Sequence, residues 1–234
     1  MKHLFLILFI SLFGVGEVCA QKEAVKNQPY ADMKLFHLGF HVGLHTEDLI
    51  LTNTGKTTAD GETWFAEIPS YSPGFSVGVI GDMFMNPYMN LRFSPTIHFG
   101  DRQFTFKEKT TGETFTTNIR SSYLNFPLDV KMAAVRLNNY RPYVITGAYY
   151  SFDIGRKKGN PLLLKNSDFG VEFGFGCDFY LPYFKLCPEL KFCFGLKDLL
   201  EKDRTDLSDA TLVKYGDALS KATSRMIILT FNFE

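Results

Sequence analysis

Apolar and polar residues alternate with a period of two over eight segments of the chain. Successive side chains of a β-strand point to opposite sides, so this period predicts strands with two different faces. In the first segment, Phe36, Leu38 and Phe40 alternate with His37 and Gly39. The predicted strands are residues 35–45, 74–83, 88–99, 123–132, 142–154, 169–179, 184–194 and 226–233.

The connections between these segments alternate in length. The short ones are residues 84–87, 135–141 and 181–182, and the long ones are residues 46–73, 100–120, 155–167 and 196–222. Short periplasmic turns, longer outer loops and an even strand number are typical of outer-membrane barrels. We therefore expect an all-β protein, an eight-stranded antiparallel up-and-down transmembrane β-barrel in the outer membrane, with both termini periplasmic.

Alternation alone does not say which face of the barrel points outward. A soluble, lipocalin-like barrel would enclose the Phe and Leu side chains around a ligand, whereas a membrane barrel turns them to lipid. Glycines are paired on the polar faces of three strands, at positions 39 and 43, 74 and 78, and 174 and 176. Small residues suit a narrow interior but weaken a strand facing solvent. The glycines therefore favour the membrane barrel.

The polar faces also carry charges of both signs. The basic side chains are Arg92, Lys131, Lys185 and Lys191, and the acidic ones are Asp82, Asp129, Glu172, Asp178 and Glu189. An eight-stranded barrel has an interior just wide enough for side chains to fill, and an unpaired charge there is costly. We therefore predict a paired network that plugs the lumen.

The N-terminus has the features of a secretory signal. Lys2 precedes an apolar run at residues 4–13, and Val18 and Ala20 are small residues at the positions before cleavage. The run is shorter than the roughly 18–20 residues that a membrane anchor needs. We expect a signal peptide at residues 1–20, a periplasmic segment at 21–34 and the barrel at 35–234.

Composition narrows the classes of function. The chain has 25 basic and 25 acidic residues, and this balance argues against nucleic acid as a partner, because such proteins carry a basic face. Aromatic residues make up 15% of the chain. A mean hydropathy of −0.05 is too polar for a bundle of membrane helices. Both values suit a sheet with one apolar face.

Two residue sets invite a metal or disulfide interpretation. His37, His41 and His45 would share a helix face, but on a strand neighbours four residues apart are separated by about 13 Å, too far for one metal ion. Cys187 and Cys193 would be about 20 Å apart on one strand, too far for a disulfide. With Cys177, they are expected to be small packing residues. We predict no metal site and no cofactor.

A lipid-modifying enzyme is an alternative, since some eight-stranded barrels are acyltransferases or lipases with Ser, His and Asp near the outer rim. His98, near Asp101 on the loop side of the third strand, is the one histidine placed for that role. No nucleophile motif accompanies it, so we expect no catalytic residues and no small-molecule substrate. Trp64, in the first long loop, is expected to pack that loop.

Four segments resemble known bacterial barrels. Residues 36–44 (FHLGFHVGL) look like the first strand of the PorT family, and residues 123–131 (YLNFPLDVK) resemble that family's Tyr-Leu-x-x-Pro-Leu strand. Residues 141–144 (RPYV) and 147–150 (GAYY) resemble the strand that follows. The Pro-Leu and Arg-Pro-Tyr pieces are shared by many barrels of Bacteroidetes, whereas the segment of the first strand is closer to PorT itself.

This resemblance implies an outer-membrane component of the type IX protein secretion system, with no established catalytic residues. A barrel this narrow is expected to be an accessory or assembly subunit and not the conduit. Its partners would be outer-membrane lipid and other type IX secretion proteins. The alternative is a structural or ligand-binding barrel with no part in secretion.

Overall fold

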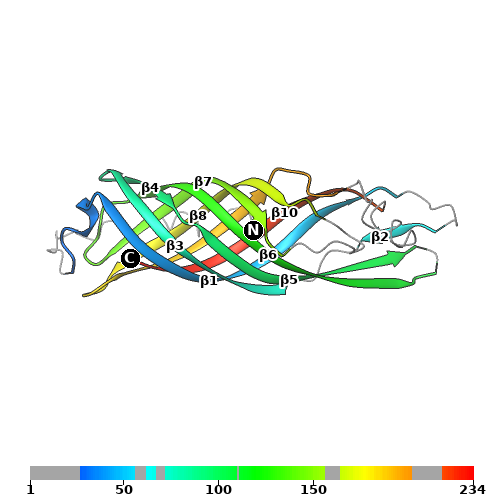
Figure 1. Cartoon of the computed structure of the whole chain (residues 1–234). Helices are drawn as coiled ribbons and strands as arrows, with labels where there is room; N and C mark the ends of the chain where they lie inside the picture. Colours follow the sequence, from blue (N-terminus) through cyan, green and yellow to red (C-terminus); the bar gives the residue numbers. More distant parts are fainter. Residues whose placement is uncertain (1–26, 56–61, 67–71, 110, 156–163, 202–217) are drawn as a thin grey trace, which may run out of the picture.

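The computed structural model describes residues 27–55, 62–66, 72–109, 111–155, 164–201 and 218–234. Apart from the short 3-10 helix η1 (Ala31–Met33), the described elements are all strands that wind around one barrel (Figure 1). They are β1 (Phe36–Asn53), β2 (Trp64–Ala66), β3 (Ser72–Asn86), β4 (Met89–Phe93), β5 (Thr96–Glu108), β6 (Thr114–Ala133), β7 (Tyr140–Asp153), β8 (Ser167–Tyr180), β9 (Lys185–Gly195) and β10 (Leu219–Phe233). None of the described residues belongs to a helix long and apolar enough to cross a bilayer.

Eight strand positions close the ring, as the sequence predicts. Their order is β1-β10-β9-β8-β7-β6-β4-β3, and pairing of β3 with β1 completes the circle. β4 and β5 both pair with β6 and share one position, because the ladder is interrupted at Ser94 and Pro95. Pro95 has no N–H to donate to a ladder. All the pairings are antiparallel, which confirms the predicted fold class.

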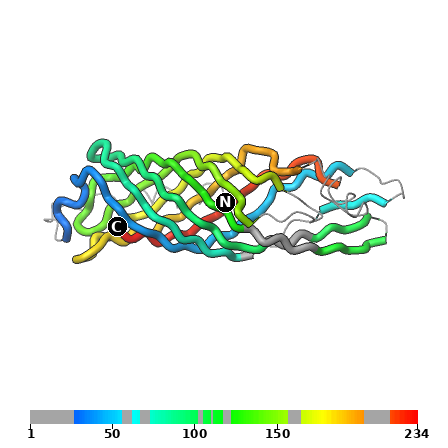
Figure 2. Tube along the Cα trace, viewed as in Figure 1, coloured from blue at the N-terminus to red at the C-terminus, as the bar shows by residue number. Residues whose placement is uncertain are grey.

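The strands at the long-loop end are longer than predicted. β5 and β6 continue as a hairpin to the pair Lys107↔Thr114, so most of residues 100–120 are strand and not loop. β1 likewise continues to Asn53 against β10. Figures 1 and 2 show these strands extending beyond the barrel.

A small apolar cluster explains why the alternation of β1 fails at this end. Glu47, Asp48 and Leu49 are buried in succession, so the period of two is lost from the sequence. Leu49 belongs to the cluster, and Trp64 lies in it with only 3% of its surface exposed. The other buried members are Ala66, Phe106, Leu164, Leu199, Leu200, Ala218, Leu219 and Ala222. Trp64 packs the long-loop end, as predicted.

The two faces of the wall differ as the membrane interpretation requires. Apolar side chains on alternate positions are exposed on the outside, and Leu38 (77%) and Phe173 (50%) are examples. Their neighbours on the same strands point inward and are buried, as Glu172 is. In β7, where the sequence phase is weakest, Tyr149 points inward and Tyr150 outward. The outside of the barrel is therefore apolar and the inside largely polar.

The inward glycines leave room for large side chains from neighbouring strands. A Cβ atom at Gly176 would lie 2.5 Å from the Tyr143 hydroxyl oxygen, and one at Gly170 would lie 2.5 Å from that of Tyr149. At Gly78 it would lie 2.5 Å from Cε1 of His41. Such distances are far below van der Waals contact, so these positions admit no side chain without movement.

We expect Gly176→Ala to lower the free energy of unfolding by about 1–3 kcal/mol, the usual cost of overpacking. Gly81→Ala is the matched control, because its Cβ would find nothing nearer than 3.8 Å. Urea unfolding of the refolded protein in phospholipid vesicles measures both. Equal stability of the two variants would show that the lumen is not tightly packed at Tyr143.

Candidate functional site

The middle of the lumen is organised around Arg92, which is 1% exposed. Its guanidinium lies 2.9 Å from Asp82 on β3, 3.3 Å from Glu189 on β9 and 2.6 Å from Glu234 at the end of the chain. Asp82 also accepts a hydrogen bond from the Asn90 amide at 2.5 Å. One cation therefore joins three carboxylates that come from distant parts of the sequence.

Three lysines complete the network. Lys131 lies 2.7 Å from Asp178, and Lys185 lies 2.5 Å from Glu234. Lys191 lies 2.8 Å from Glu172, 3.5 Å from Asp129 and 3.8 Å from Glu189. The Tyr143 hydroxyl donates to Glu189 at 2.7 Å.

All nine charges that the sequence assigned to the lumen are in this network, and the predicted pairing is confirmed. Sequence reasoning missed Glu234. It shares the face of Asn232 and Thr230 on β10, so extending the alternation by one residue would have found it. Its carboxylate pairs with two cations, Arg92 and Lys185.

The described part of the N-terminal segment lies across the short-turn end of the barrel. Asp32 is 3.2 Å from the Arg141 guanidinium and accepts a hydrogen bond from the Tyr180 hydroxyl at 2.5 Å. Arg136 stacks 3.4 Å above the Tyr180 ring and donates to the Gln28 carbonyl at 3.0 Å. These residues cap the lumen, and no periodic signal in the sequence marks them.

His37, His41, His45 and His98 point toward the inside of the barrel, where they contact different neighbours. His37 contacts the Ala31 carbonyl at 2.5 Å, and His41 is 3.0 Å from the Thr96 hydroxyl. The His45 and His98 rings meet edge to face with centroids 4.9 Å apart. No group of three His, Cys, Asp or Glu side chains within the described ranges is placed to hold a metal ion.

His98 is not placed beside Asp101. It lies in the lumen, 2% exposed, and not at an accessible rim. Asp101 is exposed on the outer surface, because an odd spacing along β5 puts the two residues on opposite faces. The structure therefore does not bring this pair together.

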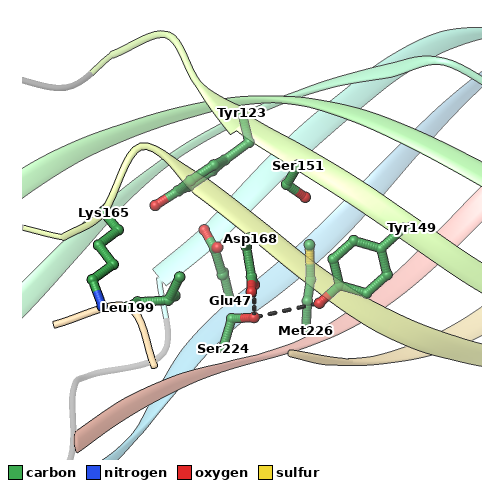
Figure 3. Close-up of a pocket in the computed structure, with 9 residues that line it drawn as sticks. All are labelled: Glu47, Tyr123, Tyr149, Ser151, Lys165, Asp168, Leu199, Ser224 and Met226. Atoms are coloured by element: carbon green, nitrogen blue, oxygen red, sulfur yellow. Dashed lines mark hydrogen bonds between the residues drawn. The ribbon is translucent and has the colours of Figure 1, made fainter. Parts of the chain in front are cut away.

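A small polar cavity lies in the lumen beneath the long-loop end (Figure 3). Ser224 donates a hydrogen bond to Asp168, and its oxygen is 3.4 Å from the Tyr149 hydroxyl. The cavity volume is about 20 Å³, which is room for one water-sized molecule. Glu47, Lys165 and Asp168 are charged residues in its lining.

Cys177, Cys187 and Cys193 are free thiols. Cys187 and Cys193 point into the lumen and are fully buried, and Cys177 is half-buried. Cys193 donates to Glu172 at 3.5 Å. Their expected role as packing residues is consistent with these positions.

The model of a protein family described as "Outer membrane protein beta-barrel domain" matches residues 19–201. The chain belongs to this family. Membership of this family indicates that the barrel lies in the outer membrane. The apolar outer face agrees with that location. No curated protein matches the chain by sequence.

Solved structures of outer-membrane proteins resemble this barrel distantly. OprG from Pseudomonas aeruginosa is 12% identical with a TM-score of 0.45, covering 85% of this chain and 93% of its own. AlkL, solved in DMPC bilayers, is 11% identical with a TM-score of 0.42, covering 94% and 96%. Ail of Yersinia pestis, in complex with the heparin analogue sucrose octasulfate, is 11% identical with a TM-score of 0.34, covering 84% and 96%.

In this outer membrane barrel, Arg92→Met would leave three buried carboxylates without their shared cation. We expect the free energy of unfolding to fall by about 3–5 kcal/mol, the cost of breaking a buried ion pair. Lys221→Met removes an exposed cation and should change it by less than about 1 kcal/mol. Urea titration in vesicles compares the two, and equal losses would contradict the network's role.

Proposed function

We propose that this protein is an accessory or assembly component of the type IX secretion system, and that it acts through contacts at its ends rather than as a conduit. The filled lumen is the observation that supports contacts at the ends rather than conduction. Asp32 and Arg141 close one end, the network around Arg92 fills the middle, and the apolar cluster around Trp64 covers the other end.

Support for the secretion role comes from the resemblance of residues 36–44 to the first strand of the PorT family. Membership in the outer-membrane barrel family is compatible with that role and does not single it out. A structural or ligand-binding barrel without a part in secretion is the second candidate. The same filled lumen supports this candidate, because a rigid barrel without a channel can equally well be a structural element of the membrane.

The proposed orientation places both termini in the periplasm. The described chain starts at Asn27 and ends at Glu234, and both lie at the short-turn end. Short turns are periplasmic in barrels of this class. The hairpin of β5 and β6 then faces the exterior, and the surfaces for partners are this hairpin and the periplasmic cap. We also propose that the protein is not an enzyme.

The filled lumen predicts that the purified protein, inserted in a planar lipid bilayer, passes no steady ion current. The interior of an eight-stranded barrel is just wide enough for its side chains, and here these side chains are paired with each other. We therefore expect no continuous water path for an ion. A general porin inserted in the same bilayer is the positive control. Stable channels at low voltage would overturn the proposal that the barrel is plugged.

Deletion of the gene tests the secretion role. We expect proteins exported by the type IX system to be lost from the medium and to accumulate in the periplasm, as quantified by mass spectrometry of both fractions. Re-expression of the full chain should restore secretion. Normal secretion in the deletion strain would reject this role and leave the structural barrel. Co-purification with other secretion components would distinguish an assembly partner from an independent factor.

A further inference from the structure

Residues 27–33, here called the strap, cross the short-turn end of the barrel and are held there by polar contacts. The side-chain amide of Asn27 donates to the Tyr180 carbonyl at 2.9 Å, and that of Gln28 donates to the Leu181 carbonyl at 2.9 Å. These bonds join the strap to the end of β8 and to the turn that follows it. The strap is therefore docked on the barrel by hydrogen bonds from outside the strand ladder.

The larger apolar side chains of the strap do not hold it in place. Tyr30 is 75% exposed and Met33 is 78% exposed, so neither packs into the barrel. Ala31 is buried, but its side chain is a single methyl group. Release of the strap would therefore expose little new apolar surface, and the polar groups that it frees would bond to water.

The backbone of the strap is strained at Gln28, whose φ angle is +46°. This left-handed conformation is unfavourable for a residue with a Cβ atom, and Pro29 adds to the cost because a residue before proline prefers an extended backbone. The Gln28 carbonyl accepts a hydrogen bond from Arg136 at 3.0 Å, which helps to hold the strained residue. Strain of this kind is found at clamps and switches, and release of the strap would relieve it.

Asp32 anchors the strap in a socket formed by Arg136, Arg141 and Tyr180. Its carboxylate lies 3.2 Å from the Arg141 guanidinium and 3.7 Å from that of Arg136, and it accepts a hydrogen bond from the Tyr180 hydroxyl at 2.5 Å. The two arginine side chains are each only 8% exposed. Among the described residues, Asp32 is the one carboxylate that pairs with either arginine, so two buried cations share a single anion. The socket therefore has the chemistry of a carboxylate-binding site.

We propose that the strap is an exchangeable internal ligand, and that the socket binds the Asp or Glu carboxylate of a segment of a partner protein. A protein segment is favoured over a small carboxylate because Arg136 also donates to the main-chain carbonyls of Asn27 and Gln28. A partner segment that offers such carbonyls and, about four residues later, a carboxylate would satisfy the same donors as the strap. This inference deepens the proposed contacts at the ends of the barrel and rests on them, but not on the secretion role.

A photoreactive peptide tests whether the socket accepts a segment from outside. The probe has the sequence of residues 27–34, with a benzophenone in place of the exposed Tyr30 ring, and is added to the full chain in lipid nanodiscs. In the wild type, the tethered strap competes at a high effective concentration. Asp32→Asn removes the anchoring charge, so we expect labelling to rise about tenfold or more, the size that one charge-assisted hydrogen bond provides. Mass spectrometry should map the crosslink to the turns at residues 134–139 and 181–184.

Matched controls separate the carboxylate from the rest of the segment. Glu113→Gln removes an exposed carboxylate at the opposite end of the barrel and should be labelled like the wild type. Adding Arg141→Gln to Asp32→Asn should abolish the gain in labelling. A probe with Asn in place of its Asp should label Asp32→Asn about tenfold less. Heat-modifiable gel mobility shows whether each variant is folded.

Equal labelling of the wild type and Asp32→Asn would overturn the exchange of the strap. Equal labelling of Asp32→Asn by the Asp and Asn probes would overturn the carboxylate site. If the double variant does not fold, the comparison of the two probes decides the proposal. Specific labelling of the socket together with normal secretion in the deletion strain would support the site and reject only the secretion role.

Discussion

Charge pairing inside a lumen with no spare volume is the constraint on which the rest of the barrel depends. Arg92 meets carboxylates from β3, β9 and the last residue of the chain, so its burial requires those three segments to be in register. A slip of one residue in any strand would turn its polar side chains to lipid and its apolar ones to the lumen. The network therefore fixes register as well as filling space.

Volume imposes the second condition, and the glycines satisfy it. Tyr143 donates to Glu189 in the network, and its ring also lies 4.1 Å from the Lys131 ammonium. The ring can occupy that place only because Gly176 on the neighbouring strand has no side chain. The ion pairs and the glycines therefore belong to one packing arrangement in the middle of the lumen.

The sequence predicted the parts of this arrangement that obey a period of two. The ring, the outward apolar stripe and the nine lumen charges all follow from alternation, and the structure confirms them. Alternation does not predict the extended ends of β1, β5 and β6. There, residues such as Leu49 are buried in an apolar cluster beyond the barrel, and this burial does not follow a period of two. The cap formed by Asp32 depends on tertiary contacts that leave no pattern. His98 and Asp101 are close in sequence, but their odd spacing along β5 puts them on opposite faces of the wall.

A plugged barrel can act only on what touches its ends or its wall. The ends are closed by Asp32 and Arg141 at one side and by the cluster around Trp64 at the other, so partners there would meet formed surfaces and not an opening. The described wall carries exposed apolar side chains on alternate positions, as Leu38 and Phe173 do. Those side chains meet the hydrocarbon of the bilayer in the same way all around the ring, so any selective contact would have to be made at the two ends, where polar and charged groups are exposed.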